Sequence, residues 1–212
     1  MSSINSGDLG MMNPDSKIVI FLNHCGALIL NNFLWLICCI PIVTAGAATR
    51  AMYANLNAHL NDEECGFLSF FRHFRKDFLR SCGIGLILIA VAVIALTDIL
   101  LIGSDGVPGG VFLVGFIGFG GMLTAMFGTV VFPLMVRFEL PFKKLVITSF
   151  SVSIGFLPRV LPAALLQLVA TMLFLFFTPF FVKISLFWAL LGFALTAMLT
   201  LKLLNPVLDR LA

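Results

Sequence analysis

Residues 106–136 read GVPGGVFLVGFIGFGGMLTAMFGTVVFPLMV, and this stretch decides the fold. It contains no Asp, Glu, Lys or Arg. A helix of about 20 apolar residues crosses roughly 30 Å of hydrocarbon, whereas a helix on the surface of a water-soluble domain needs a polar face. The stretch therefore predicts a membrane-spanning helix.

The same pattern recurs along the chain, because further charge-free runs cover 18–49, 81–97, 160–182 and 184–201. From these runs we predict an all-α membrane protein with five transmembrane helices and two amphipathic cytoplasmic connectors. The predicted spans are approximately 18–44, 82–102, 111–136, 160–182 and 184–204. With 212 residues, this five-span bundle at 18–204 leaves no room for a separate soluble catalytic domain.

Basic residues are distributed unevenly between the predicted connectors. Eleven of the thirteen Lys and Arg residues lie in segments 45–81 and 137–159 and in the C-terminal part of the chain, whereas Lys17 and Lys183 fall on the other side. By the positive-inside rule, the connectors and the C-terminus face the cytoplasm, and the N-terminus faces outward. The polar tail 1–17 is expected to be disordered outside, and 205–212 form a cytoplasmic tail.

The two connectors, 48–80 and 139–155, are predicted to be amphipathic. In each, apolar side chains recur at helical spacing beside basic residues, and in 65–80 this apolar face is made of phenylalanines. An aromatic face bordered by cations is typical of a helix in the membrane interface next to anionic lipid, and a docking surface for a partner is the alternative. The candidate lipid or partner interface consists of Phe67, Phe70, Phe71, Phe74, Phe78, Arg72, Arg75, Lys76, Arg80, Phe142, Lys143 and Lys144.

Polar residues inside the predicted spans are expected to have hydrogen-bonding or ionic partners, because unpaired polar groups are costly in lipid. His24 and Asp98 are both predicted near the outer leaflet and form a candidate ion pair; alternatively, Asp98 reaches the outer water and His24 bonds to a neighbouring helix. Gly120, Thr124 and Gly128 follow a four-residue spacing that lets a second helix, from this chain or a partner, approach closely.

Motifs for catalysis are absent from the sequence. It contains no G-x-x-x-x-G-K-[ST] phosphate loop, no His-Glu-x-x-His and no Gly-x-Ser-x-Gly, and its five cysteines form no Cys-x-x-Cys pair. We therefore predict no enzymatic activity, no cofactor and no metal site. Nucleic acid is not an expected partner, because lipid explains the Phe-rich basic segment better.

Residues 30–55 carry a recognisable signature, and they are followed by an acidic turn and a Phe-rich run that ends at Lys76-Asp77-Phe78. The signature consists of Asn32, Trp35, Pro41, Thr44, Gly46, Ala51 and Tyr53. It resembles the start of the YesL-type family of small bacterial membrane proteins, which have no established activity. Within it, Asn32, Trp35, Pro41 and Gly46 are candidate helix-packing residues, since Pro41 and Gly46 bend the chain and permit close packing.

The resemblance implies a role in carbohydrate uptake, because genes of this family often neighbour sugar ABC transporters. We therefore expect an accessory membrane protein that contacts the permease subunits of such a transporter. An independent small-solute carrier or channel, and a membrane sensor or scaffold, are the alternatives. Homo-oligomerisation is compatible with all three.

Overall fold

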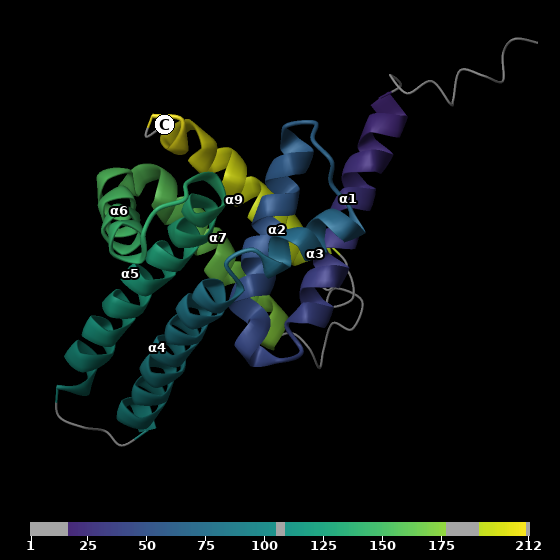
Figure 1. Ribbon diagram of the computed structural model, residues 1–212. Helices are drawn as coiled ribbons and strands as arrows, with labels where there is room; N and C mark the ends of the chain where they lie inside the picture. The colour runs from purple at the N-terminus through teal and green to yellow at the C-terminus, as the bar shows by residue number, and fades with distance from the viewer. Residues whose placement is uncertain (1–16, 105–108, 177–190, 211–212) are drawn as a thin grey trace, which may run out of the picture.

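The computed structural model describes residues 17–104, 109–176 and 191–210, and every regular element in these ranges is helical (Figure 1). The predicted tail 1–16, the ends of the spans that fall within 177–190, and residues 211–212 lie outside the described residues. The elements are α1 (Lys17–Cys38), the short 3-10 helix η2 (Ile42–Thr44), α2 (Ala45–Leu60), α3 (Phe67–Arg75), α4 (Phe78–Ser104), α5 (Gly110–Arg137), α6 (Phe142–Gly155), α7 (Leu157–Phe176) and α9 (Phe193–Leu208).

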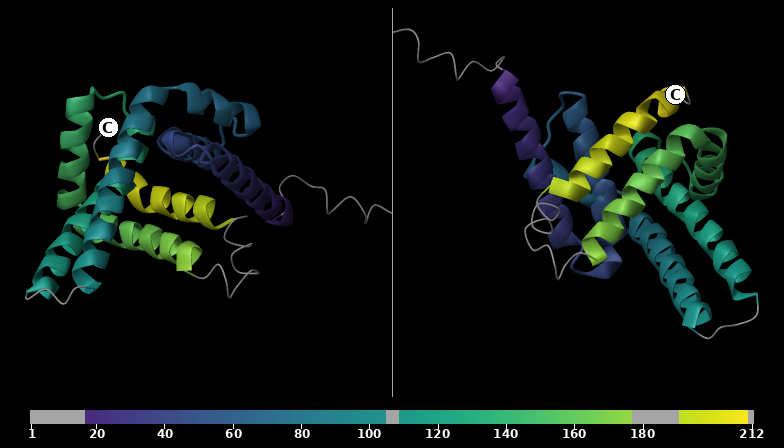
Figure 2. Two further views of the ribbon diagram at one scale, coloured as in Figure 1. Left: turned by 90° about the horizontal axis from the view of Figure 1, so that it is seen from below. Right: turned by 180° about the vertical axis from the view of Figure 1, so that it is seen from behind.

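Helices α4 and α5 form a hairpin that projects from the rest of the molecule (Figures 1 and 2). Both are long and apolar enough to cross a membrane, over Phe78–Ile102 and Gly110–Arg137. Many side chains along the hairpin are exposed and apolar, among them Ile94 and Phe116. Because so large an apolar surface is unfavourable in water, the hairpin indicates a membrane protein.

The remaining apolar segments give a less regular picture than five separate spans. The described residues contain two spanning helices, or three if α6 and the first part of α7 count as one broken span. These two helices meet at an angle of 101°. The bend lies at Gly155 and Phe156, where the second predicted connector ends. The apolar helices Leu22–Cys38 and Phe193–Leu208 are shorter.

Helices α1 and α2 form an antiparallel hairpin. The imidazole rings of His24 and His59 lie 4.6 Å apart between centroids, and the Asn55 amide donates to Asn31 Oδ1 at 2.9 Å. The connecting turn is apolar and exposed, with Ile40 78% accessible. The start of α1 and the end of α2 therefore lie at the same end of the hairpin.

Helix α2 is the central helix of the fold and packs against α1, α3, α4, α5 and α9. None of its side chains is exposed, so residues 48–60 do not form the surface-lying amphipathic segment expected from the sequence. The reason is composition. Besides the apolar stripe containing Met52 and Leu56, its other faces carry mostly alanine and neutral polar side chains, which allow neighbours to pack all around it.

The start of α2 crosses the start of α4 at very short range. A Cβ added at Gly46 would lie 2.9 Å from the carbonyl carbon of Ser81 and 3.0 Å from Cα of Gly85. A Cβ added at Gly85 would lie 2.6 Å from Cα of Gly46. Only glycine fits on both sides, and the crossing anchors the projecting hairpin to the central helix.

Candidate functional site

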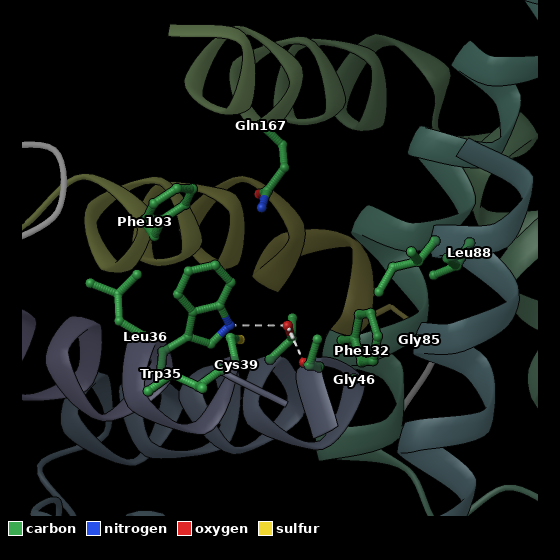
Figure 3. A pocket seen from close by; sticks show the side chains of 13 residues that line it. Trp35, Leu36, Cys39, Gly46, Gly85, Leu88, Phe132, Gln167 and Phe193 are labelled. Carbon is green, nitrogen blue, oxygen red and sulfur yellow. Dashed lines mark hydrogen bonds between the residues drawn. The ribbon is translucent and has the colours of Figure 1, made fainter. Parts of the chain in front are cut away.

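A cavity of about 530 Å³ opens beside this crossing, where α1, α2, α4, α5, α7 and α9 converge (Figure 3). Its walls are mostly apolar. The rings of Trp35 and Phe193 lie 4.7 Å apart between centroids, and Leu88 and Phe132 lie toward the α4–α5 side. Gln167 reaches toward the cavity from α7. An apolar cavity with a few polar groups is suited to holding an apolar ligand or side chain.

Hydrogen bonds fix the polar groups on the cavity wall. Trp35 Nε1 donates to Thr49 Oγ1 at 3.1 Å, and Thr49 Oγ1 donates in turn to the carbonyl of Ala45 at 2.8 Å. This chain orients the indole ring against Phe193. The sequence signature included Trp35 and Gly46, and the structure brings both to the wall of one cavity.

Buried asparagines join α1 to its neighbours. Asn55 also pairs with the backbone of Gly66, as donor to its carbonyl and acceptor from its N–H, both at 3.3 Å. The side-chain oxygen of Asn32 accepts from the backbone N–H of Ala194 at 2.9 Å. These bonds connect α1, α2, the start of α3 and α9. Each bond gives a buried polar group the partner that water supplies in the unfolded chain.

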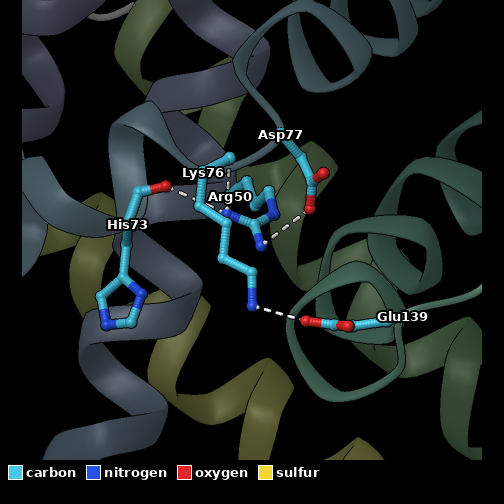
Figure 4. Close-up of polar contacts among 5 residues, drawn as sticks. All are labelled: Arg50, His73, Lys76, Asp77 and Glu139. Atoms are coloured by element: carbon cyan, nitrogen blue, oxygen red, sulfur yellow. Dashed lines mark hydrogen bonds and ion pairs between the residues drawn. The ribbon is translucent and has the colours of Figure 1, made fainter.

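Arg50 holds the junction between α3 and α4 (Figure 4). Its side chain is 3% accessible, and Nη1 donates to the carbonyls of His73 and Lys76 at 3.0 and 2.9 Å. Nη2 lies 3.4 Å from Asp77 Oδ2. Asp77 has a φ of 53°, so the chain makes a tight turn there, and Arg50 satisfies carbonyls left over at the end of α3.

The electrostatics of this junction follow from burial and the crowding of cations. Burial lowers the pKa of Arg50, while Asp77 raises it and Arg80 lowers it. Burial also lowers the pKa of His73, and the nearby Arg50 adds to the effect. The hydrogen bond from Lys76 Nζ to Glu139 Oε1, 2.8 Å long, lowers the pKa of the Glu139 carboxyl. The junction thus links α3 and α4 to the segment between α5 and α6.

The aromatic face predicted on α3 turns mostly toward the protein. Phe70 is fully buried, Phe71 and Phe74 pack against the core, and only Phe67 is well exposed. The expected contact of this whole face with lipid is therefore not what the structure shows, because α1 and α2 occupy it. The charged and connector members of the set have different environments: Arg72, Arg75, Lys76, Phe142, Lys143 and Lys144 are exposed, whereas Phe78 and Arg80 are half-buried.

The predicted glycine face of α5 is used only in part. A Cβ at Gly128 would lie 3.4 Å from the Leu88 side chain, so this position packs against α4. At Gly120 a Cβ would meet no atom within 4 Å among the described residues. Thr124 Oγ1 donates to the carbonyl of Gly120 in its own helix. Pro41 is exposed in the apolar turn.

The structure does not bring the proposed pair His24 and Asp98 together. His24 lies against His59, while the outer part of α4 and the start of α1 lie at opposite extremities of the molecule in every view (Figures 1 and 2). The pairing assumed that both helix ends approach one membrane surface. The α1–α2 hairpin prevents this, because it directs the start of α1 away from the α4–α5 tip.

Several residues of the site were absent from the sequence-based candidates, notably Arg50, Asn55, Thr49 and Phe193. An arginine inside an Ala-rich apolar segment was the available signal for Arg50. Among the described residues, no group of three or more His, Cys, Asp or Glu side chains is placed to hold a metal ion.

Comparison with known proteins adds one finding. Residues 28–99 match the family described as "Protein of unknown function, DUF624". The matched region contains α2, α3, the second half of α1 and most of α4, and with them the glycine crossing and the Arg50 junction. The match supports similarity to an uncharacterised family, with which the YesL-type resemblance is consistent. No curated protein and no solved structure matches the chain.

Proposed function

We propose that this chain is a non-catalytic integral membrane protein that serves as an accessory partner of a carbohydrate ABC transporter in the bacterial cytoplasmic membrane. The transporter link comes from the YesL-type resemblance of residues 30–80. The structural support is a helix surface suited to a membrane partner.

That surface, the glycine-rich outer half of α5, consists of Gly115, Gly118 and Gly121 along one side of the helix and Gly120 on another. A Cβ at any of these positions would meet no atom within 4 Å among the described residues. Small residues in a lipid-facing helix let a second helix approach closely, and van der Waals packing then drives association. An open glycine-rich surface on a projecting apolar hairpin is the observation that carries the proposal.

For the arrangement in the membrane, we propose that all five predicted apolar segments insert into the bilayer. The basic connectors and the C-terminus face the cytoplasm. The α1–α2 hairpin revises the expected outward N-terminus. Because the start of α1 and the tip of the α4–α5 hairpin lie at opposite extremities of the molecule (Figures 1 and 2), the start of α1 belongs on the side of the membrane opposite that tip.

Affinity purification in mild detergent tests the partnership. We expect the tagged wild-type chain to recover permease subunits from native membranes, and the double substitution Gly120→Leu, Gly121→Leu to recover several-fold less. Gly26→Leu is the matched control, because Gly26 is an equally open helical glycine on α1. Recovery of the wild-type chain alone, from membranes that contain the permease, contradicts the proposal. Recovery only of a second, differently tagged copy assigns this glycine-rich surface to a homo-oligomer instead.

The cavity beside Trp35 favours one alternative, an independent carrier of small apolar solutes. Proteoliposomes that contain only this protein distinguish the two. The variant Thr49→Leu fills the cavity and spares the α2–α4 crossing, which Gly85→Leu would disturb. Loss of uptake in Thr49→Leu supports the carrier. No uptake above that of empty liposomes favours the accessory role.

A further inference from the structure

The turn that joins α1 to α2 is suited to hydrocarbon rather than to water. Its side chains are apolar and exposed, with Ile40 and Ile42 78% and 65% accessible. Two of its carbonyl groups are bonded inside the turn, because Thr44 Oγ1 donates to the carbonyl oxygens of Cys38 and Pro41 at 2.5 and 2.8 Å. No water satisfies such groups in lipid, so internal hydrogen bonds are what a turn needs in order to enter a bilayer.

The apolar cavity of about 530 Å³ lies between this turn and α4 (Figure 3). Ile40 lines it from the turn, and Gly85, Leu88 and Ile89 line it from α4. These three residues follow Phe78, where the membrane-spanning part of α4 begins, by 7, 10 and 11 residues. At a rise of about 1.5 Å per residue they lie roughly 10–17 Å into a hydrocarbon layer about 30 Å thick. The cavity therefore lies at the depth of the lipid tails and not at that of the headgroups.

The opening of the cavity is apolar as well. Ile40 both lines the cavity and is mostly exposed, which places it at the opening. On α4, the neighbouring side chains of Leu86 and Ile87 are also exposed. The cavity wall thus continues without a polar rim onto the surface of the α4–α5 hairpin that faces lipid. Lipid tails are the molecules that meet such an opening inside a bilayer.

The polar groups of the cavity wall are mostly bonded to one another. Trp35 Nε1 donates to Thr49 Oγ1, and Thr49 Oγ1 donates to the carbonyl of Ala45. Among the described lining residues, Gln167 provides the one amide side chain. A sugar or an ion leaves water only for many hydrogen-bond partners, whereas a hydrocarbon chain needs none. The size also fits a chain, since an apolar protein cavity of about 150 Å³ already holds a benzene molecule.

We propose that this cavity binds one acyl chain of a membrane lipid. The chain enters sideways past Ile40 and lies against the rings of Trp35 and Phe193, which are 4.7 Å apart between centroids. It supplies the van der Waals contacts that the apolar walls of an empty cavity would lack. The inference rests on the position of the α4–α5 hairpin in the bilayer and not on the transporter partnership.

The test is photolabelling of the full chain in phosphatidylcholine bilayers. A small share of the lipid carries a photoreactive diazirine on one acyl chain, and mass spectrometry locates the labelled residues after irradiation. Phe132 and Phe193 line the cavity but are only 6% and 7% accessible, so lipid that merely surrounds the protein hardly reaches them. We expect both to be labelled in the wild-type chain, together with the exposed Ile87 on α4.

Two matched variants of α4 connect this labelling to the cavity. Ile89→Phe adds a ring at the cavity wall and is expected to lower labelling of Phe132 and Phe193 about fivefold or more, because the ring takes the space of the chain. Ile87→Phe makes the same change two positions away, at a side chain that is 59% accessible and outside the cavity lining. It is expected to leave labelling of the two phenylalanines unchanged.

A small apolar diazirine, used as a second probe, separates a lipid chain from a free apolar solute. Labelling of Phe132 and Phe193 by the small probe but not by the lipid overturns the proposal and favours the solute carrier. Labelling by the lipid that stays on exposed positions such as Ile87 also overturns it, and this comparison needs no variant. Equal loss of labelling in Ile89→Phe and Ile87→Phe has the same consequence.

Discussion

The glycine crossing between α2 and α4 offers the sharpest structural prediction. Substituting Gly46 by alanine places a methyl group 2.9 Å from the carbonyl carbon of Ser81 and 3.0 Å from Cα of Gly85. Ordinary carbon–carbon contacts are about 3.5–4.0 Å, so the two helices must separate by roughly 1 Å. Both neighbours are backbone atoms, which cannot swing away as a side chain does.

We expect Gly46→Ala to destabilise the protein by about 3 kcal/mol, the upper part of the range for overpacked cores. In a chain of this size, this corresponds to a melting temperature about 6–12 °C lower. Gly83→Ala is the matched control. Gly83 lies in α4, two residues before Gly85, and a Cβ added there meets nothing within 4 Å. That control is expected to be neutral or slightly stabilising, since alanine favours helix.

The assay is thermal unfolding of both variants in the same detergent, followed by circular dichroism or a thiol-reactive dye. Equal melting temperatures for Gly46→Ala and Gly83→Ala would refute the close approach of α2 and α4. This holds whether both variants keep the wild-type melting temperature or both lower it by the same amount.

Three further predictions follow from the polar contacts and the hairpin. Asn31→Leu and Asn55→Leu are each expected to cost about 2 kcal/mol, with a coupling of about 1 kcal/mol in a double-mutant cycle; strictly additive losses would contradict their hydrogen bond. Burial and neighbouring cations lower the pKa of His73 from its ordinary 6.5, so the unfolded chain binds more protons below that pH. The melting temperature should therefore fall as the pH drops below 6.5, and less so in His73→Gln; a melting temperature that rises toward acid contradicts this sign. Finally, a tag before Lys17 should be inaccessible to an antibody in intact cells and should become accessible only after permeabilisation. Labelling of the tag in intact cells would instead support the outward N-terminus predicted from the sequence.

The sequence predicted the helical class and the membrane character well, because both follow from local pattern. A charge-free run such as 111–136 has one stable outcome, a helix in lipid, and α5 covers this run. The break at Gly155 was also visible, since glycine and the following Pro158 interrupt a helix. Gly46 was assigned to close helix packing, and the structure shows what it packs against.

What the sequence did not reveal depends on contacts between distant residues. Periodicity identified an apolar stripe on α2 but not the five helices that enclose it, because alanine fits a surface and a core equally well. In the same way, the phenylalanines of α3 mark one face, and periodicity does not distinguish protein from lipid as its neighbour. The pairing of His24 with Asp98 failed because it rested on assumed membrane depth, whereas His24 packs against His59.

We infer from its exposed apolar surface that the projecting α4–α5 hairpin lies in hydrocarbon. Its most direct test places a spin label at Ile94 or Phe116, both exposed, in the protein reconstituted into bilayers. We expect frequent collisions with oxygen, which dissolves in lipid, and few with a water-soluble nickel complex; a label at the exposed Cys65 is expected to show the reverse. Strong collision with the nickel complex at both hairpin positions would contradict the claim.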